Sequence, residues 1–419
     1  MTKTLSSITR YAIYTLLIFT PLARGSVQGW AITVIHMITL IALAAFLLEK
    51  NLTGNWEWIK TPLDKPIICL LILCLLSSVF SEHRPTSFWA LILLLNYIAI
   101  FYLVIHTFHT RSQIKQLGYA VVGIALFLSI FGMVKQGGAN PFPWWEYTDT
   151  TLNRELAAAS STYGNPNHYA GYLVMAIPLA LGLLTTGVRG VSFFVLFSLA
   201  LILLSALILS GSRGGWVSAF VGILLTGTLY LASSQYRHTK YFYLLFAGMT
   251  ILLIVALSSR SVVIDLRSFG SLEGDSSILS RASVWKNTFK MITDYPLLGS
   301  GPGTFALIFT QYQPVGTGLP VRYYYAHNDY LQNTAEIGLL FLAIAGWSIL
   351  NVFQTGFRKL KYNSRLIRGI TMGGLGSVSA ILIFSIADFN LHIPANALLF
   401  TIIAAIVVTP VPTENAHHR

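Results

Sequence analysis

The segment "YYYAHNDYLQ", residues 323–332, places a histidine, an amide and a carboxylate directly before an apolar stretch. The ordinary pKa of histidine, about 6.5, suits a general base near neutral pH, so His327 is a candidate base. Asp329, Gln332 and Glu336 follow on one face of the expected helix. A polar stripe on a membrane helix must face protein or a water-filled cavity. The alternative is an aromatic belt that anchors at the depth of the lipid headgroups.

Two arginines lie in segments that suit phosphate binding. Arg213 occurs in "GSRGGW", where the glycines allow close approach of the backbone. Arg281 occurs in "SRASVW", within an amphipathic pattern. The planar guanidinium matches the oxygens of a phosphate group. The alternatives are an Arg213 side chain that extends to the interface and an Arg281 side chain that meets lipid phosphates.

The segment "YGNPNHYAGYL" predicts the start of a helix. Asn165 is a suitable N-cap, and Pro166 suits the first helical position. The free N–H groups at such a helix start could bind an anion. His168 is a further candidate, with a polar interfacial residue as the alternative.

The composition indicates a membrane protein. The chain has 419 residues, of which 54% are hydrophobic and 10% charged, whereas a soluble domain carries about 25% charged residues. Long apolar runs predict a polytopic, all-α membrane protein that forms one integral domain over 1–419. The start of the chain resembles a signal peptide but lacks a good cleavage site. Cys69 and Cys74 fall on different helix faces, so we expect neither a disulfide nor a metal site.

We expect about twelve transmembrane helices with both termini in the cytoplasm. In that orientation, the cytoplasmic segments carry 16 of the 27 lysines and arginines, and the short external segments carry 5. The other 6 lie in a long periplasmic loop, 259–327, inserted between the ninth and tenth spans. The predicted spans are 8–23, 27–48, 66–81, 86–106, 115–134, 166–186, 190–209, 214–233, 240–258, 328–353, 366–387 and 394–411.

The long loop contains a predicted interfacial helix. Apolar residues recur at helical spacing from Ile278 to Ile292, and the helix should begin near Asp275 and end before Pro296. We interpret the glycine-rich segment "LLGSGPGTF" after it as a tight, mobile turn, because it lacks the spacing of a nucleotide-binding loop. The sequence contains 15 acidic residues and no His/Cys cluster with the spacing of metal ligands. If the substrate is a pyrophosphate, we therefore expect cationic side chains rather than Mg²⁺ to neutralise it.

Five segments together resemble the bacterial O-antigen ligase and polymerase superfamily. They are "GNPNHYAGYL", "GSRGGW", "SRASVWKNTFKMITDYPLLGSGPGTF", "AHNDYLQNTAEIGLLFLAI" and "FSIADFN". The resemblance implies a fold similar to the GT-C glycosyltransferases. It also implies glycan transfer from undecaprenyl pyrophosphate to an acceptor hydroxyl at the periplasmic face of the inner membrane. Chain length is most similar to the ligases, whose acceptor is a sugar of the lipid A–core oligosaccharide.

The resemblance also implies roles for individual residues. His327 matches the general base of the family, and Arg213 and Arg281 match its essential arginines. No metal, cofactor or ATP is implied, and the partners are the two lipid-linked glycans and the bilayer, without nucleic acid. Asp329 or Glu336 would orient His327. Weaker candidates for substrate contacts are Arg84, Arg154, Asn165, His168, Asn328, Asp329 and Glu336.

Three other functions remain open at this point. A Wzy-type O-antigen polymerase uses the same donor but takes an identical glycan unit as acceptor. A protein O-oligosaccharyltransferase of the same superfamily is less similar, because its additional C-terminal soluble region has no counterpart in the sequence. A transporter or channel is the non-enzymatic alternative, but it should place polar groups near the middle of the membrane.

Overall fold

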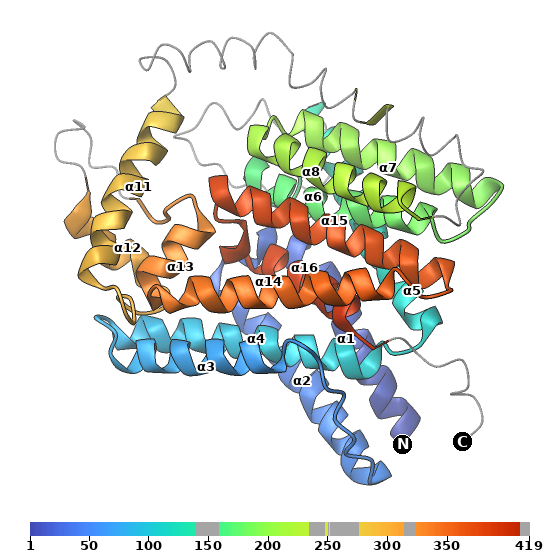
Figure 1. Cartoon of the computed structure of the whole chain (residues 1–419), viewed down its shortest axis with the longest axis horizontal. Helices are drawn as coiled ribbons and strands as arrows, with labels where there is room; N and C mark the ends of the chain where they lie inside the picture. The colour runs from blue at the N-terminus through green and yellow to red at the C-terminus, as the bar shows by residue number, and fades with distance from the viewer. Residues whose placement is uncertain (139–158, 234–247, 250, 252–275, 314–322, 411–419) are drawn as a thin grey trace.

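The computed structural model describes residues 1–138, 159–233, 248–249, 251, 276–313 and 323–410 (Figure 1). Within these ranges the regular secondary structure is entirely helical. The α-helices are α1 (Thr2–Leu22), α2 (Gly29–Thr53), α3 (Asp64–Val79), α4 (Arg84–Thr107), α5 (Arg111–Gln136), α6 (Pro166–Leu184), α7 (Val191–Leu209), α8 (Arg213–Leu231), α11 (Ser276–Asp294), α12 (Phe305–Ile308), α13 (Asp329–Ile337), α14 (Leu340–Lys359), α15 (Arg365–Ala387) and α16 (Pro394–Val408). The 3₁₀ turns are η1 (Arg24–Ser26), η5 (Phe309–Tyr312) and η6 (Asn390–His392).

The helices identify a multi-pass membrane protein. In the described part of the chain, 8 helices are long and apolar enough to cross a membrane: α2, α4, α5, α6, α7, α8, α14 and α15. Helices α1, α3 and α16 also lie at predicted spans but are not among these 8. The predicted span 240–258 lies almost wholly outside the described residues, so the predicted count of twelve is not confirmed.

The predicted span 328–353 is wrong as one continuous helix. Helix α13 ends at Ile337, and α14 begins at Leu340. Between them Gly338 has φ +88°, and a Cβ atom there would lie 2.0 Å from the carbonyl oxygen of Leu297. The N–H of Leu339 donates to the carbonyl of Pro296 over 2.9 Å. The chain therefore breaks because it packs closely against the turn that follows α11, which only glycine permits.

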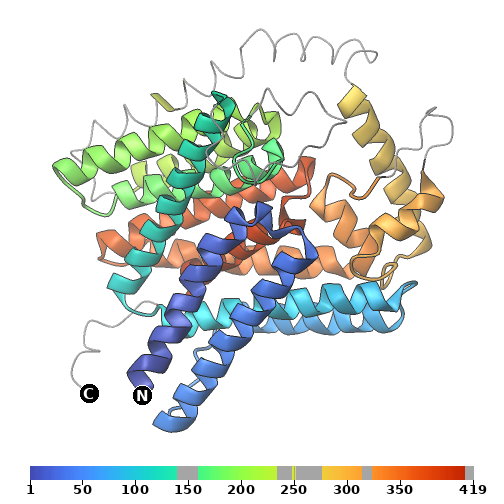
Figure 2. The ribbon, with the colours of Figure 1, turned by 180° about the vertical axis from the view of Figure 1, so that it is seen from behind.

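Helices α6 and α15 form the centre of the bundle and are held together by small residues. Almost all of α6 is buried, and α15 lies between α6 and α14 (Figures 1 and 2). A Cβ atom on Gly182 would lie 2.3 Å from the carbonyl oxygen of Gly369 and 2.7 Å from the Cα of Gly373. Small residues at such crossings let two membrane helices approach closely enough to pack backbone against backbone.

Short helices cover one end of the bundle. Helices α11, α12 and α13 lie together at one end of the bundle, beside the ends of α3 and α4, and α11 runs at a steep angle to α14 (Figures 1 and 2). The helix predicted in the loop 259–327 corresponds to α11, which ends at Asp294, before Pro296 as expected. The segments 80–83, 210–212 and 388–393 join long helices at this same end.

The close contact between α6 and α15 predicts that Gly182→Ala destabilises the fold. The added methyl group has no space against the backbone of α15, and such overpacking costs about 1–3 kcal/mol. We expect a lower unfolding temperature in detergent. Gly123→Ala, on α5, is the control, because a Cβ atom there meets nothing within 4 Å. Equal unfolding temperatures for the two variants would contradict this account of the crossing.

Candidate active site

His327 lies between the segment 323–326 and α13, with its ring directed toward the end of α15. Its backbone has φ +51°, a left-handed conformation that few residues other than glycine adopt and that is common at functional sites. The Nδ1 atom lies 3.6 Å from Oδ1 of Asp388, and the side chain is 35% exposed. The ring meets Phe389 edge-on, with 5.0 Å between ring centroids. His327 is thus oriented by buried groups on one side and open on the other.

Asp388 is the carboxylate that faces His327. It follows α15 directly, is 2% exposed, and accepts a hydrogen bond from the N–H of Phe389 over 2.8 Å. Burial alone would raise the pKa of the Asp388 carboxyl. The facing His327 and the charges of His168 and Arg281 outweigh burial, so the pKa of Asp388 is lowered below its ordinary value. The carboxylate therefore stays ionised at neutral pH.

Helix α11 is hydrogen-bonded to both segments that carry the His327–Asp388 pair. The Nη1 of Arg281 donates to the carbonyl of Ala387 over 3.0 Å, one residue before Asp388. One turn further along α11, Nε1 of Trp285 donates to the carbonyl of Ala326 over 2.9 Å, one residue before His327. The two contacts fix α11 across the facing segments and place the Arg281 guanidinium beside Asp388.

Arg213 lies at the same end of the bundle, as the first residue of α8. The N-cap Ser212 accepts from the N–H of Gly215 and donates its hydroxyl hydrogen to Oδ1 of Asn167 over 2.7 Å. A Cβ atom on Gly214 would lie 2.9 Å from the Phe384 ring, in the last turn of α15. The start of α8 therefore packs between the starting turn of α6 and the end of α15, which carries Asp388.

Asn165 is the N-cap of α6, as predicted. Its side-chain oxygen accepts from the N–H groups of Asn167 and His168, over 2.8 and 3.3 Å. The cap therefore satisfies two of the donors that could have bound an anion. The His168 ring meets Phe389 edge-on at 4.9 Å, so Phe389 contacts both candidate histidines. Tyr325 stacks on Phe389 with 3.9 Å between centroids.

Asp329 lies next to the site but has partners other than His327. It is 2% exposed and accepts hydrogen bonds from the Ser385 hydroxyl (2.8 Å) and the Leu391 N–H (3.1 Å). Its other oxygen lies 2.6 Å from Nδ1 of His392. Burial disfavours the charged imidazole, but the hydrogen bond and the charges of Asp329 and Glu336 outweigh it, so the pKa of His392 is raised.

Glu336 also has a different role from the one expected. Its carboxylate accepts from the N–H groups of Gly303 (2.7 Å) and Phe305 (3.1 Å). Burial raises the pKa of Glu336 above its ordinary value, although these hydrogen bonds act in the opposite direction. The predicted polar stripe on α13 thus faces protein: Asp329 binds the α15–α16 link, and Glu336 binds the glycine-rich turn.

That glycine-rich turn is tight, as predicted, but it is held by the backbone of α13. The N–H of Ser300 donates to the backbone carbonyl of Ala335 over 3.0 Å, and the N–H of Gly301 donates to the backbone carbonyl of Glu336 over 2.8 Å. Asn328 caps α13 by accepting from the N–H of Leu331 over 3.0 Å.

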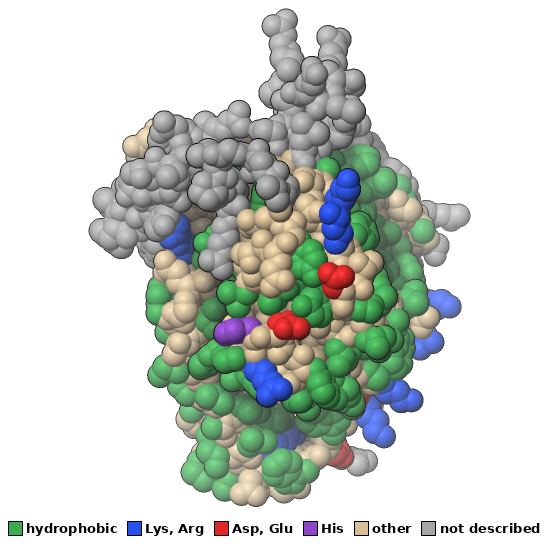
Figure 3. All heavy atoms as spheres, turned by 90° about the vertical axis from the view of Figure 1, so that its left-hand side faces the viewer, with side chains coloured by type: hydrophobic (Ala, Val, Ile, Leu, Met, Phe, Trp, Pro, Cys, Tyr) green, Lys and Arg blue, Asp and Glu red, His purple; other side chains and the backbone are tan. Residues whose placement is uncertain are grey.

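The remaining predicted site residues are peripheral or not described. Arg84 is an exposed residue at the start of α4. Arg154 lies outside the described residues. Figure 3 shows the end of the molecule that carries the site, where histidine, acidic and basic side chains lie near one another among hydrophobic groups. In the described part of the chain, no group of three or more His, Cys, Asp or Glu side chains is arranged to hold a metal ion.

Sequence reasoning missed the carboxylate that faces His327 and the histidine that faces Asp329. Asp388 and His392 both lie in "ADFNLH", between the last two predicted spans. The charge distribution had already placed this segment on the same side as His327, and Asp388 is its only acidic residue. Those two facts together were the signal that could have identified Asp388.

Part of the chain matches a known protein family. The sequence model described as O-antigen ligase matches residues 198–346. The resemblance to the O-antigen ligase superfamily is confirmed. The match covers a little over a third of the chain and includes Arg213, Arg281 and His327, whereas Asp388 lies beyond it. A search of curated proteins found no match to the chain.

The Asp329–His392 contact predicts a pH-dependent stability. Because the pKa of His392 is raised by folding, its contribution is complete below about pH 6.5 and is lost as the pH rises through the raised value. Such a charged hydrogen bond contributes about 1.5–3 kcal/mol. We expect the unfolding temperature to fall between pH 6.5 and 8.5, and to fall less in His392→Gln. The control His109→Gln, an exposed residue, should keep the wild-type slope. Parallel profiles for all three proteins would show that His392 does not contribute.

Proposed function

We propose that the protein is an O-antigen ligase that joins O-antigen polysaccharide from undecaprenyl pyrophosphate to a sugar hydroxyl of the lipid A–core oligosaccharide. The observation that carries the proposal is that His327 faces the buried Asp388 carboxylate. Arg281 is held beside this pair by its hydrogen bond to the carbonyl of Ala387, the residue before Asp388. The family match over Arg213, Arg281 and His327 supports the same class of reaction.

His327 is the proposed general base. Its Nδ1 faces Asp388, which leaves Nε2 as the nitrogen that accepts the proton of the acceptor hydroxyl. The hydroxyl oxygen attacks the anomeric carbon while the bond from that carbon to the pyrophosphate oxygen breaks. Asp388 stabilises the imidazolium that forms, as the carboxylate does in other histidine-based sites. Direct attack without a covalent intermediate gives inversion at the anomeric carbon.

The arginines are the proposed binding groups for the leaving pyrophosphate. Negative charge develops on its bridging oxygen, and fixed cations that face this charge lower the barrier by a few kcal/mol each. Arg281 uses one of its N–H donors on the Ala387 carbonyl, which holds the guanidinium in place. Arg213 lies at the start of α8, where the helix dipole also favours an anion. We propose that these cations replace a metal ion in this role.

The distribution of charge supports a periplasmic site at the inner membrane. In the described part of the chain, the segments predicted to be external by the count of lysines and arginines lie at the His327 end. Arg213 is the first residue of α8 and Asp388 directly follows α15, so these polar groups lie at the helix ends rather than halfway along the helices. This location favours surface chemistry over transport, which would place the binding groups near the membrane centre. Both termini would then be cytoplasmic.

A reconstituted assay tests the proposed reaction. Purified protein should transfer glycan from the undecaprenyl pyrophosphate donor to lipid A–core, and EDTA should leave the rate unchanged. His327→Ala should lower the rate by about 10²–10⁴-fold, the usual contribution of a general base. The control variant His109→Gln should retain full activity. Extension of the lipid-linked glycan without modification of lipid A–core would indicate a polymerase, and complete loss of transfer in EDTA would refute the metal-independent mechanism.

Asp388 gives a second test, because its role acts through His327. Asp388→Asn keeps the size of the side chain but removes the charge that stabilises the imidazolium. We expect kcat to fall by about 10²-fold or more while KM for the acceptor changes little. Asp388→Glu should restore part of kcat. A change confined to KM would instead place Asp388 among the groups that bind substrate.

A further inference from the structure

Basic side chains gather at the end of the bundle opposite His327. Helix α14 leads away from α13, and its far end is joined to the start of α15 (Figure 1). Exposed cations lie on this connection, on the helix ends beside it and on the nearby connection between α6 and α7: Arg189, Arg358, Lys361 and Arg365. We call these residues the basic patch.

Packing contacts bring the segments of the basic patch together. A Cβ atom on Gly187 would lie 3.5 Å from Cδ of Arg365, so the α6–α7 connection, which carries Arg189, lies against the first turn of α15. The Nζ of Lys359 donates to the carbonyl of Ile406 over 3.2 Å, which joins the last turn of α14 to the last turn of α16. The basic patch therefore lies where the ends of α6, α14, α15 and α16 meet.

The helices that meet at the basic patch carry no opposing charge. Within their bounds, α6, α7, α14, α15 and α16 contain no aspartate or glutamate. Lys359, which follows Arg358, is 6% exposed, and in the described part of the chain its ammonium group is hydrogen-bonded to a neutral carbonyl. Because charges interact more strongly in a medium of low dielectric constant, this buried ammonium group adds to the positive potential at the patch. The potential there favours an anion.

The surroundings of the basic patch favour a lipid over a soluble anion. Phe357 and Tyr362 flank Arg358 and Lys361 in the sequence, and they are 44% and 49% exposed. Phe194, in the first turns of α7, is 67% exposed. Exposed aromatic residues next to cations are typical of the depth of the lipid headgroups. An anion at the patch would therefore have hydrocarbon on one side and water on the other, as the phosphate of a phospholipid has.

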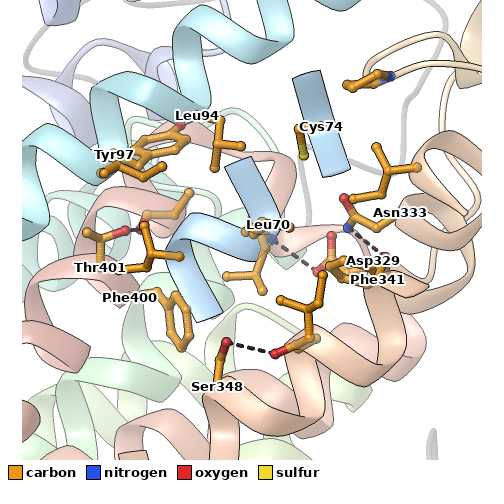
Figure 4. A pocket seen from close by; sticks show the side chains of 18 of the residues that line it. Leu70, Cys74, Leu94, Tyr97, Asp329, Asn333, Phe341, Ser348, Phe400 and Thr401 are labelled. Atoms are coloured by element: carbon orange, nitrogen blue, oxygen red, sulfur yellow. Dashed lines mark hydrogen bonds between the residues drawn. The ribbon is translucent and has the colours of Figure 1, made fainter. Parts of the chain in front are cut away.

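The basic patch is distinct from an apolar cavity elsewhere in the bundle. This cavity has a volume of about 450 Å³ and lies among α3, α4, α14 and α16 (Figure 4). Asp329 and Glu336 are among the residues that line it, all of which belong to the described part of the chain, and no lysine or arginine is. On α14 its lining extends from Phe341 to Val352 and so does not reach the patch. The cavity offers no Lys or Arg side chain to a phosphate, whereas the patch offers several.

We propose that the basic patch binds the phosphate group of an anionic glycerophospholipid from the leaflet opposite His327. The guanidinium groups of Arg358 and Arg365 and the ammonium group of Lys361 are the donors to the phosphate oxygens. Because these donors belong to α14, to α15 and to the connection between them, the bound lipid holds the two helix ends together. A ligand that binds only the folded state stabilises it. The proposal does not depend on the proposed glycosyl transfer.

Thermal unfolding with added lipid tests the proposal. The full-length protein in a nonionic detergent is heated with dioleoyl phosphatidylglycerol or with dioleoyl phosphatidylcholine, which has the same acyl chains but no net charge. We expect a higher unfolding temperature with phosphatidylglycerol. The triple variant Arg358→Gln, Lys361→Gln, Arg365→Gln should lose more than half of this difference. If that variant is not monodisperse, Arg365→Gln alone should lose a smaller part of it.

The triple variant Lys3→Gln, Lys60→Gln, Lys65→Gln is the matched control. These lysines are exposed on α1 and at the start of α3, away from the basic patch, so their loss removes the same charge and should leave the effect of phosphatidylglycerol unchanged. An equal loss in the two triple variants, or an unchanged lipid effect in the patch variants, would overturn the proposal. Glycerol 3-phosphate, which lacks acyl chains, should not raise the unfolding temperature. A rise as large as that with phosphatidylglycerol would overturn the choice of a lipid.

Discussion

The buried carboxylate of Asp329 is the interaction on which the candidate site depends. Its two oxygens bind the Ser385 hydroxyl, the Leu391 N–H and the His392 ring, which all belong to α15 or to the link that follows it. Asp329 itself begins α13, two residues after His327. One carboxylate therefore joins the segment that carries His327 to the segment that carries Asp388. A buried Asp329 carboxylate without these hydrogen-bond partners would cost several kcal/mol, so we expect the loss of one partner to destabilise the whole contact between the two segments.

Helix α11 completes this arrangement from the outside. Its Trp285 donates to the carbonyl of Ala326, and its Arg281 donates to the carbonyl of Ala387. These two acceptors are the residues directly before His327 and Asp388. His327 can keep a left-handed backbone because the residues on both sides of it are held by other contacts. The Arg281 side chain thereby has two roles, since the same guanidinium that secures α11 also contributes positive charge beside Asp388.

Local features of this protein were predictable from its sequence, and long-range features were not. The cap at Asn165 and the end of α11 were predicted because each depends on residues within about one turn of helix. The break at Gly338 was missed, since it depends on the carbonyl of Leu297, 41 residues earlier in the chain. His327 was selected by its chemistry and its resemblance to a family. Its facing carboxylate was assigned to Asp329 or Glu336, because helical spacing says nothing about which partner comes from α15.

Helix α13 separates two chemical environments. On the side of His327, the described groups include Arg281 and the start of α8 with Arg213, which suit an anionic leaving group. On the other side, the carboxylates of Asp329 and Glu336 line the polar end of an apolar cavity. Because electrostatic interactions are stronger in a medium of low dielectric constant, we expect the two sides of α13 to differ in their preference for an anion. The polar stripe of α13 thus satisfies buried hydrogen bonds and also forms the polar end of the apolar cavity.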